Sequence, residues 1–174
     1  MYIRPNFDKI LKQALWIVLF ACVVALGYNL FSPKGIPLIG NWEPKVLESG
    51  VTVPPSYTPE EDAPVISLAQ AYAEFNTGQA IFLDSRKTEE YQAGHIPGAL
   101  QLYLEEFDTQ YELVKDRLPK DSQIIAYCGG DECELSLFVA RNLKAEGYTN
   151  LKVFFGGWKE WQEAKLPVTK GEKP

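Results

Sequence analysis

The sequence predicts an α/β domain with a mainly parallel sheet and helices on both sides, which we place at residues 65–170 of the 174-residue chain. Three short apolar runs have the length and composition of buried strands, and each ends in polar or glycine-rich residues: Ala80–Asp84, Ile124–Tyr127 and Leu151–Phe155. The segments between these runs carry apolar residues at helical spacing. Strands that alternate with helices are typical of a parallel sheet covered on both faces.

Two of the intervening segments have a clear apolar face. In the first, apolar residues recur at spacings of three and four: Leu104, Phe107, Tyr111, Val114 and Leu118. In the second, they recur at every fourth residue: Leu135, Val139 and Leu143. Each set lies on one side of a helix, and the second helix is expected to end before Gly147. In such sheets, chemistry collects where the carboxyl ends of strands meet the amino ends of helices.

The composition is that of a globular protein and excludes several classes. Apolar residues make up 46% and aromatic residues 13% of the chain, which is enough for a core. The net charge is -6, and the 17 basic residues are scattered among 23 acidic ones, so we expect no nucleic-acid partner. Three cysteines exclude a disulfide scaffold but leave room for one functional pair. With a single histidine and no C-x-x-C pair, we predict no metal and no cofactor.

An apolar segment near the amino terminus has the length of a membrane span. Residues 14–31 carry no formal charge and are mostly Leu, Val, Ala, Phe and Ile. A segment of this length is near the lower limit for crossing about 30 Å of hydrocarbon as a helix. We therefore predict a single transmembrane anchor at residues 13–32, after a cytoplasmic segment at residues 1–12.

The charges before the anchor predict its orientation. Arg4, Lys9 and Lys12 are opposed only by Asp8, and basic residues favour the cytoplasmic side of a membrane. The amino terminus is then cytoplasmic, and the domain lies on the outer face of the cytoplasmic membrane, which is the periplasmic face in a bacterium. Two alternatives stay open: a cleavable secretory signal, although no small-x-small pattern follows the apolar run, and a helix buried in a soluble core.

Residues 33–64 form a proline-rich linker between the anchor and the domain. The linker holds seven of the twelve prolines, and proline lacks the backbone donor that a helix or a central strand needs. We interpret this stretch as a tether or a wrapping arm. Its apolar segment 36–42 either packs on the domain or lies at the membrane interface, where Trp is favoured. Residues 171–174 form a short tail.

The segment 127–136, of sequence YCGGDECELS, joins the second strand to the following helix. A cysteine at that junction, here Cys128, faces amide hydrogens that no helical carbonyl uses and the positive end of the helix dipole. Both favour the thiolate, which is the nucleophilic form. Gly129 and Gly130 permit a curled loop whose N–H groups converge on an anion. The motif therefore predicts a nucleophilic cysteine in an anion-binding loop.

Motifs on either side of this loop follow one another in a specific order. They are Asp84-Ser85-Arg86, Glu90-Tyr91, Gly94-His95-Ile96-Pro97-Gly98-Ala99, Tyr127-Cys128, Gly147-Tyr148, Gly156-Gly157-Trp158, Trp161 and Leu166-Pro167-Val168. Over residues 65–169 the chain resembles the rhodanese superfamily. The resemblance implies a three-layer fold with a five-stranded parallel sheet flanked by helices, present here as one domain behind a membrane anchor.

The resemblance also implies a function and the residues that perform it. It makes the protein a sulfurtransferase that moves sulfane sulfur through a persulfide on Cys128 to a thiol or another nucleophilic acceptor. The expected partners are a small sulfur-containing donor, a thiol acceptor and a thiol reductant protein. The loop residues that match the family's substrate-binding loop are Gly129, Gly130, Asp131, Glu132, Glu134 and Leu135. Those that match its structural framework are Asp84, Arg86, Glu90 and His95, with Arg86 pairing with Glu90 and His95 stabilising a turn.

The loop departs from the common single-domain pattern of the family. Cys133 occupies the spacing at which an arginine is expected, and Ser136 lies two positions later than the expected serine. The loop is therefore longer and lacks its cation, which also argues against phosphatase or arsenate-reductase chemistry. The carboxylates of Asp131, Glu132 and Glu134 should disfavour dianionic donors such as thiosulfate and oppose thiolate formation.

The second cysteine of the loop has two interpretations. Cys133 is either a small packing residue or a resolving thiol that attacks the Cys128 persulfide, and closure of a disulfide needs the two Cα atoms within roughly 7 Å. The pair itself indicates a thiol–disulfide redox protein as an alternative function. The acidic loop indicates a second alternative, a noncatalytic module that binds sulfur species or a protein partner.

Overall fold

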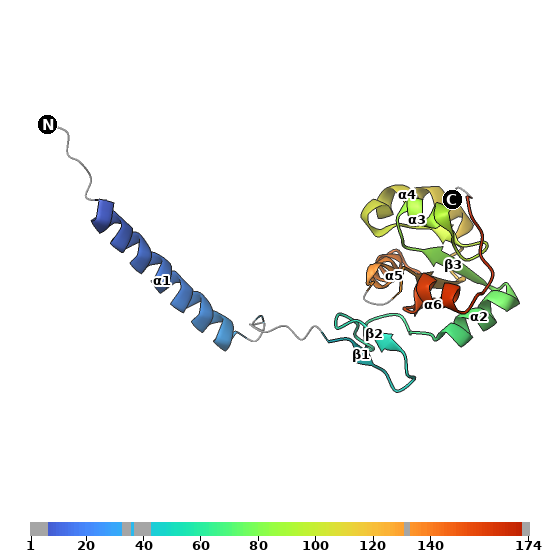
Figure 1. Cartoon of the computed structure of the whole chain (residues 1–174), viewed down its shortest axis with the longest axis horizontal. Coiled ribbons are helices and arrows are strands. Elements are labelled where there is room, and N and C mark those ends of the chain that lie inside the picture. Colours follow the sequence, from blue (N-terminus) through green and yellow to red (C-terminus); the bar gives the residue numbers. More distant parts are fainter. Residues whose placement is uncertain (1–6, 33–35, 37–42, 131–132, 172–174) are drawn as a thin grey trace. The chain divides into compact units, whose positions relative to one another are not determined.

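The computed structural model describes residues 7–32, 36, 43–130 and 133–171 and divides the chain into two units, Met1–Asn41 and Trp42–Pro174. The first unit consists of one helix, α1 (Phe7–Phe31), drawn in blue in Figure 1. Its 25 residues extend over roughly 38 Å at the usual rise of about 1.5 Å per residue. None of these residues is buried, and the most apolar part has a mean hydropathy of 2.2.

The helix α1 begins earlier than the predicted span, so that Asp8, Lys9 and Lys12 lie within its first turns. By length and composition α1 is able to cross a membrane, and a signal sequence at this position has the same properties. Of the apolar segment 36–42, which was expected to pack on the domain or at the membrane interface, residues 37–42 lie outside the described residues.

The second unit contains the predicted parallel sheet. Its strands are β3 (Ala80–Asp84), β4 (Leu100–Gln101), β5 (Gln123–Tyr127) and β6 (Leu151–Phe154), in the spatial order β4-β3-β5-β6, with every pair parallel. The three strands predicted from apolar runs are therefore confirmed to within one residue at each end.

The expected count of five strands is wrong, because the described residues form a four-stranded parallel sheet. On the outer side of β6, Val65 makes only an isolated parallel bridge to Val153. Ile66 donates its N–H to the Val153 carbonyl at 3.0 Å, and Val153 donates to the Pro64 carbonyl at 2.9 Å. Since Pro64 has no N–H to offer, pairing does not extend beyond this bridge.

Side chains of β5 alternate between the two faces of the sheet, as expected for a strand. Ile125 and Tyr127 pack on the face covered by α2 (Leu68–Thr77) and α6 (Gly157–Glu163), beside the fully buried Trp161. On the opposite face, Ile124 and Ala126 pack against residues of α5 (Leu135–Ala145). Figure 1 shows α2 and α6 as neighbours in this unit. The three-layer architecture predicted from the sequence is therefore confirmed.

Two further segments complete the second face. The predicted helical face of residues 104–118 is divided among η1 (Leu104–Glu106), α4 (Phe107–Val114) and η2 (Lys115–Arg117), and its apolar residues join one core cluster. The other predicted helix is α5 (Leu135–Ala145), which ends before Gly147. A short helix, α3 (Thr88–Ala93), connects β3 to β4.

Residues 43–64, hereafter the arm, pack against the domain. The arm contains a small antiparallel pair, β1 (Lys45–Val46) and β2 (Thr52–Val53). Val53 and Tyr57 are buried in a cluster with residues of α5 and with Phe155, and the Tyr57 and Phe155 rings meet edge to face at 5.9 Å. The Arg141 guanidinium on α5 donates to both carboxylate oxygens of Asp62, at 2.7 and 2.8 Å. This ion pair attaches the arm to α5.

The Asp62 ion pair predicts an acid-sensitive contribution to stability. The hydrogen bond from Arg141 lowers the pKa of Asp62, so the stabilisation is complete above the unfolded value of about 4 and is lost as the pH falls through the folded value. We expect Asp62→Asn to lower the free energy of unfolding by about 1–3 kcal/mol at pH 7. Denaturant unfolding of the full-length protein in detergent should show this difference shrinking at pH 3. An equal difference at both pH values would contradict the prediction.

Candidate active site

Cys128 lies where the sequence places it, directly after β5 and before α5, and it is fully buried. Its carbonyl accepts the N–H of Trp158 at 2.8 Å, and the Gly129 carbonyl accepts the N–H of Lys159 at 3.0 Å. Both donors belong to the first turn of α6. The start of the Cys128 loop is therefore held by backbone hydrogen bonds to α6, and no side chain in the loop sequence predicts these bonds.

Two glycines make this close approach possible. Gly157 has a φ of +55°, and a Cβ at this position would meet the carbonyl oxygen of Cys128. Gly130 has a φ of +100°, and its Cβ would lie 2.6 Å from the carbonyl oxygen of Gly156 and 2.9 Å from the Cβ of Lys159. Both positions combine a left-handed backbone with a lack of space. The loop and the start of α6 therefore require glycine at these two points.

The structure joins Cys128 and Cys133 by a disulfide, with the two Cα atoms 6.4 Å apart. This separation meets the geometric requirement for closure. The loop curls back on itself, since Cys133 donates its N–H to the Gly130 carbonyl at 3.3 Å. The Cys128 sulfur lies 3.1 Å from the Cys133 carbonyl oxygen and 3.5 Å from the hydroxyl of the buried Ser136, which is oriented to donate to it.

Arg86 has a different ion-pair partner from the one expected. Its Nε and Nη2 donate to the carboxylate of Asp84, with Nη2–Oδ2 at 2.6 Å, so the predicted pairing with Glu90 is wrong. Arg86 Nη2 also donates to the Gly94 carbonyl at 2.7 Å, and the guanidinium carbon lies 4.7 Å from the centre of the Trp158 ring. Asp84 is the last residue of β3, and both of its carboxylate oxygens accept hydrogen bonds from the guanidinium. Arginine favours this bidentate geometry.

The framework residues thus support the loop indirectly. Tyr127 donates its hydroxyl to Asp84 Oδ2 at 2.8 Å and accepts the N–H of Ile96 at 3.1 Å. Burial raises the pKa of Tyr127 far above its ordinary value, and the Asp84 charge acts in the same direction. The phenol therefore stays protonated and donating. The buried Asp84 and Arg86 therefore connect the end of β3 to the half-buried Trp158, whose N–H binds the Cys128 carbonyl.

His95 is fully buried and lies in a backbone connection. Its N–H and carbonyl pair with Thr169 at 2.9 and 3.0 Å, and its Nδ1 lies 2.8 Å from the Tyr91 carbonyl oxygen. The imidazole stacks on the Tyr91 ring with the centroids 3.8 Å apart. These contacts hold the segment after α3 against the C-terminal segment.

The remaining predicted loop residues have different environments. Leu135 begins α5, and Glu134 directly precedes that helix. The Glu134 carboxylate accepts the hydroxyl of Ser56 at 2.8 Å. Asp131 and Glu132 lie outside the described residues. The contact of Ser56 with Glu134 was not predicted, because no sequence motif includes Ser56. Trp158 belongs to the motif Gly156-Gly157-Trp158, but the sequence alone gave it no role.

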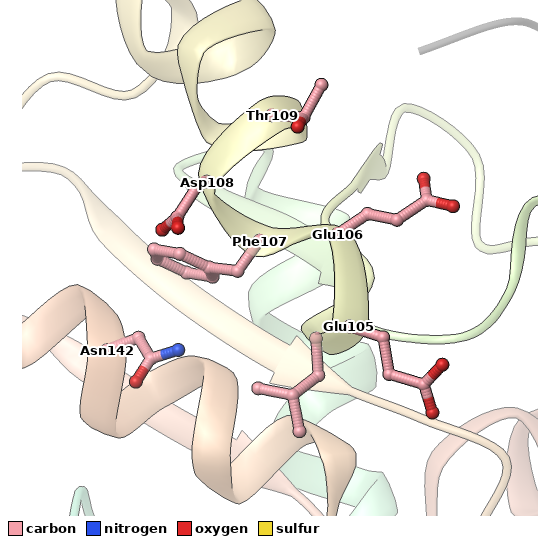
Figure 2. A pocket seen from close by; sticks show the side chains of 7 residues that line it. Glu105, Glu106, Phe107, Asp108, Thr109 and Asn142 are labelled. Carbon is pink, nitrogen blue, oxygen red and sulfur yellow. The ribbon is translucent and has the colours of Figure 1, made fainter.

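A hollow of about 300 Å³ lies between residues 104–109 and α5, where Asn142 completes its lining (Figure 2). Three carboxylates belong to this lining, those of Glu105, Glu106 and Asp108. The Cys128 loop is not part of it. Among the residues that the structure describes, no group of three His, Cys, Asp or Glu side chains is arranged to hold a metal ion.

Comparison with known proteins identifies the fold family. The profile of the rhodanese-like domain matches residues 67–164, which is more than half of the chain. The chain belongs to the rhodanese-like domain family. The match covers the whole parallel sheet, the Cys128 loop and both helices that flank that loop, and it begins after the arm.

Individual relatives support this assignment. Human thiosulfate:glutathione sulfurtransferase is 31% identical over 113 residues, covering 58% of this chain and 95% of the human protein. The HTH-type transcriptional regulator Rv0324 of Mycobacterium tuberculosis is 38% identical over 112 residues, covering 64% of this chain but only 46% of the regulator, so the chain spans less than half of that relative. The crystal structure of the BH2092 protein from Bacillus halodurans matches with a TM-score of 0.56 and 25% identity, covering 63% of this chain and 78% of that one.

The two loop glycines of this rhodanese-like domain should respond differently to substitution. Gly130→Ala forces a Cβ into the Gly156 carbonyl and Lys159, whereas a Cβ at Gly129 meets nothing within 4 Å. We expect Gly130→Ala to lower stability by about 1–3 kcal/mol and to displace the loop, and Gly129→Ala to change stability by less than about 1 kcal/mol. Denaturant unfolding of the two variants tests this. Equal stabilities would show that Gly130 is not constrained by α6.

Proposed function

We propose that this protein is a rhodanese-type sulfurtransferase that carries sulfane sulfur as a persulfide on Cys128. The observation that supports this most directly is the position of the Cys128 sulfur, at the amino end of α5 and 3.5 Å from the Ser136 hydroxyl. The helix dipole and this donor both stabilise an anionic sulfur. The human relative that matches over nearly its whole length is named as a sulfurtransferase.

The reaction has two displacement steps. The Cys128 thiolate attacks the outer sulfur of a donor, a new S–S bond forms, and the bond from that sulfur to the rest of the donor breaks with its electron pair. Cys128 then carries –S–S⁻. An acceptor thiolate attacks the outer sulfur, leaves as a persulfide, and regenerates the Cys128 thiolate.

The disulfide defines a closed state of this cycle. Cys128 is fully buried and bonded to Cys133, so a two-electron thiol reductant has to open the pair before a donor reacts. In the resolving role, the Cys133 thiolate attacks the inner sulfur of the Cys128 persulfide, forms the disulfide and releases HS⁻. A membrane or extracytoplasmic thiol reductant is the partner that this cycle needs.

The function is tested by detecting the persulfide directly. The full-length protein is reduced, freed of reductant, and incubated separately with thiosulfate and with glutathione persulfide, and the Cys128 peptide is then analysed by mass spectrometry. We expect a gain of one sulfur atom on that peptide. No added sulfur with either donor, in the wild type and also in Cys133→Ala, would count against the proposal.

A second function, thiol–disulfide exchange, is favoured by the disulfide itself. In that case the reduced pair transfers two electrons to a disulfide substrate and forms the Cys128–Cys133 bond without any sulfane sulfur. Reduction of a glutathione mixed disulfide by the protein, together with no persulfide from either donor, would favour this alternative. If the protein neither forms a persulfide nor reduces the mixed disulfide, the third interpretation, a noncatalytic binding module, would be favoured.

We further propose that α1 anchors the domain on the outer face of the cytoplasmic membrane. The helix is long and apolar enough to span a bilayer, and the basic residues near its amino end favour a cytoplasmic amino terminus. The thiol acceptor and the reductant are then extracytoplasmic.

The orientation predicts the behaviour of a reporter fusion. Alkaline phosphatase fused after Pro174 should be active, because that enzyme folds only where its disulfides form. β-Galactosidase at the same position is the control and should be inactive. The opposite pattern would overturn the orientation.

A further inference from the structure

We propose that Ser56 is a positioning residue of the active site: its hydroxyl holds the Glu134 carboxylate away from the amino end of α5, which leaves that helix end to the Cys128 sulfur. Ser56 belongs to the arm, which lies outside the residues matched to the family. The inference deepens the proposed function, and it rests on Cys128 being the reacting sulfur.

Glu134 and Cys128 compete for the same positive end of a helix. Glu134 directly precedes α5, an 11-residue helix, and Ser136 in the first turn of α5 donates toward the Cys128 sulfur. A carboxylate near a helix amino end gains about 0.3–1 kcal/mol from the dipole and from free amides. If Glu134 took up that position, its charge would lie beside the Cys128 thiolate or persulfide and oppose it.

The structure shows Glu134 in a different arrangement. Its Oε1 accepts the Ser56 hydroxyl at 2.8 Å, a contact between residues 78 positions apart in the chain. In the described part of the chain, the Glu134 side chain makes no capping hydrogen bond to α5. The carboxylate is thus bound to the arm, which leaves this helix end to the Cys128 sulfur once the disulfide is reduced and the thiolate forms.

Ser56 is itself fixed by the packing of the arm. Arg141 Nη2 donates to the Ser56 carbonyl at 2.9 Å while the same guanidinium binds Asp62. Tyr57, the next residue, is buried. The pKa of Arg141 is raised first by the hydrogen bond to Asp62 and then, in decreasing order, by the charges of Asp62, Glu61 and Glu134, so the guanidinium also attracts Glu134. Arg141 therefore supports both the hydroxyl that binds Glu134 and the carboxylate that is bound.

The test measures the reactivity of Cys128 without any sulfur donor. The reduced full-length protein in detergent is alkylated with iodoacetamide from pH 5 to pH 9, and the rate at the Cys128 peptide is read by mass spectrometry. We expect Ser56→Ala to slow alkylation by about two- to fivefold near neutral pH, which is the fold-change that corresponds to the helix-end interaction. The plot of alkylation rate against pH should also shift to higher pH. Ser56→Thr, which keeps the hydroxyl, should retain the wild-type profile.

A rescue separates positioning from a general structural effect. Adding Glu134→Gln to Ser56→Ala removes the competing charge and should restore the wild-type profile, whereas a merely structural defect would persist. Glu61→Gln, an arm carboxylate whose side chain is exposed, is the charge control and should rescue nothing. An unchanged profile in Ser56→Ala, or a slowed profile that Glu134→Gln leaves slow, would overturn the inference. This test uses no sulfur donor, so its outcome does not depend on whether the protein forms a persulfide. Failure of the proposed function and failure of this inference can therefore be distinguished.

Discussion

Cys128→Ser is expected to abolish the protein persulfide completely, for every donor that loads the wild type. A serine hydroxyl is not ionised near neutral pH and cannot retain sulfane sulfur, so neither step of the proposed cycle is possible. The substitution replaces a buried sulfur with a smaller oxygen and removes a short-range disulfide. The β5 and α5 contacts on both sides of the loop remain, so we expect the fold to persist.

The matched control uses the chain's third cysteine. Cys22 lies exposed in α1 and is not disulfide-bonded, so Cys22→Ser should load sulfur at the wild-type level. Near-ultraviolet circular dichroism would check that Cys128→Ser is folded. Sulfane sulfur transferred at the wild-type rate by folded Cys128→Ser would show that Cys128 is not the carrier.

Cys133→Ala is expected to make the Cys128 persulfide accumulate. A thiol within the same short loop acts at an effective concentration of millimolar or more. Removing it should therefore slow persulfide decay, without added thiol, by at least about tenfold and suppress sulfide release. The 6.4 Å between the two Cα atoms supports such a role, because the loop closes without being extended.

Single-turnover measurement of persulfide decay distinguishes a resolving thiol from a packing residue. If Cys133 only packs, Cys133→Ala costs about 1 kcal/mol of stability and leaves the decay rate unchanged. Added glutathione should accelerate decay in the variant, because an external acceptor then replaces the missing thiol. Equal decay rates in the wild type and the variant, without added thiol, would contradict the resolving role.

Local pattern was sufficient to predict the elements that build the sheet. The apolar run at β5 has the right length and ends at a cysteine and two glycines, and these features lie within about ten consecutive residues. The same is true of β3 and of the amphipathic helix α5. Cys128 at a strand–helix junction follows from this local order alone, since parallel α/β sheets place such junctions at one edge.

The partner of Arg86 illustrates where local reasoning ended. Glu90 and Asp84 are both within reach in sequence, and spacing does not distinguish them. The structure places the buried Asp84 at the end of β3 with both oxygens facing the guanidinium, which also contacts the Gly94 carbonyl and the half-buried Trp158 ring. Burial favours the partner with the better geometry, because an imperfectly paired charge is costly away from water.

The sequence by itself thus determined the α/β class, the apolar helix at the amino terminus and the strand–helix junction at which Cys128 lies, all of which depend on residues close together in the chain. Tertiary structure alone decided that the sheet has four strands among the described residues, that the arm packs on α5, and that Ser56 binds Glu134. These features join residues that are distant in sequence. Their formation depends on which buried polar groups can form hydrogen bonds with one another once the core has formed. The periodicity of apolar residues in the sequence does not specify these pairings.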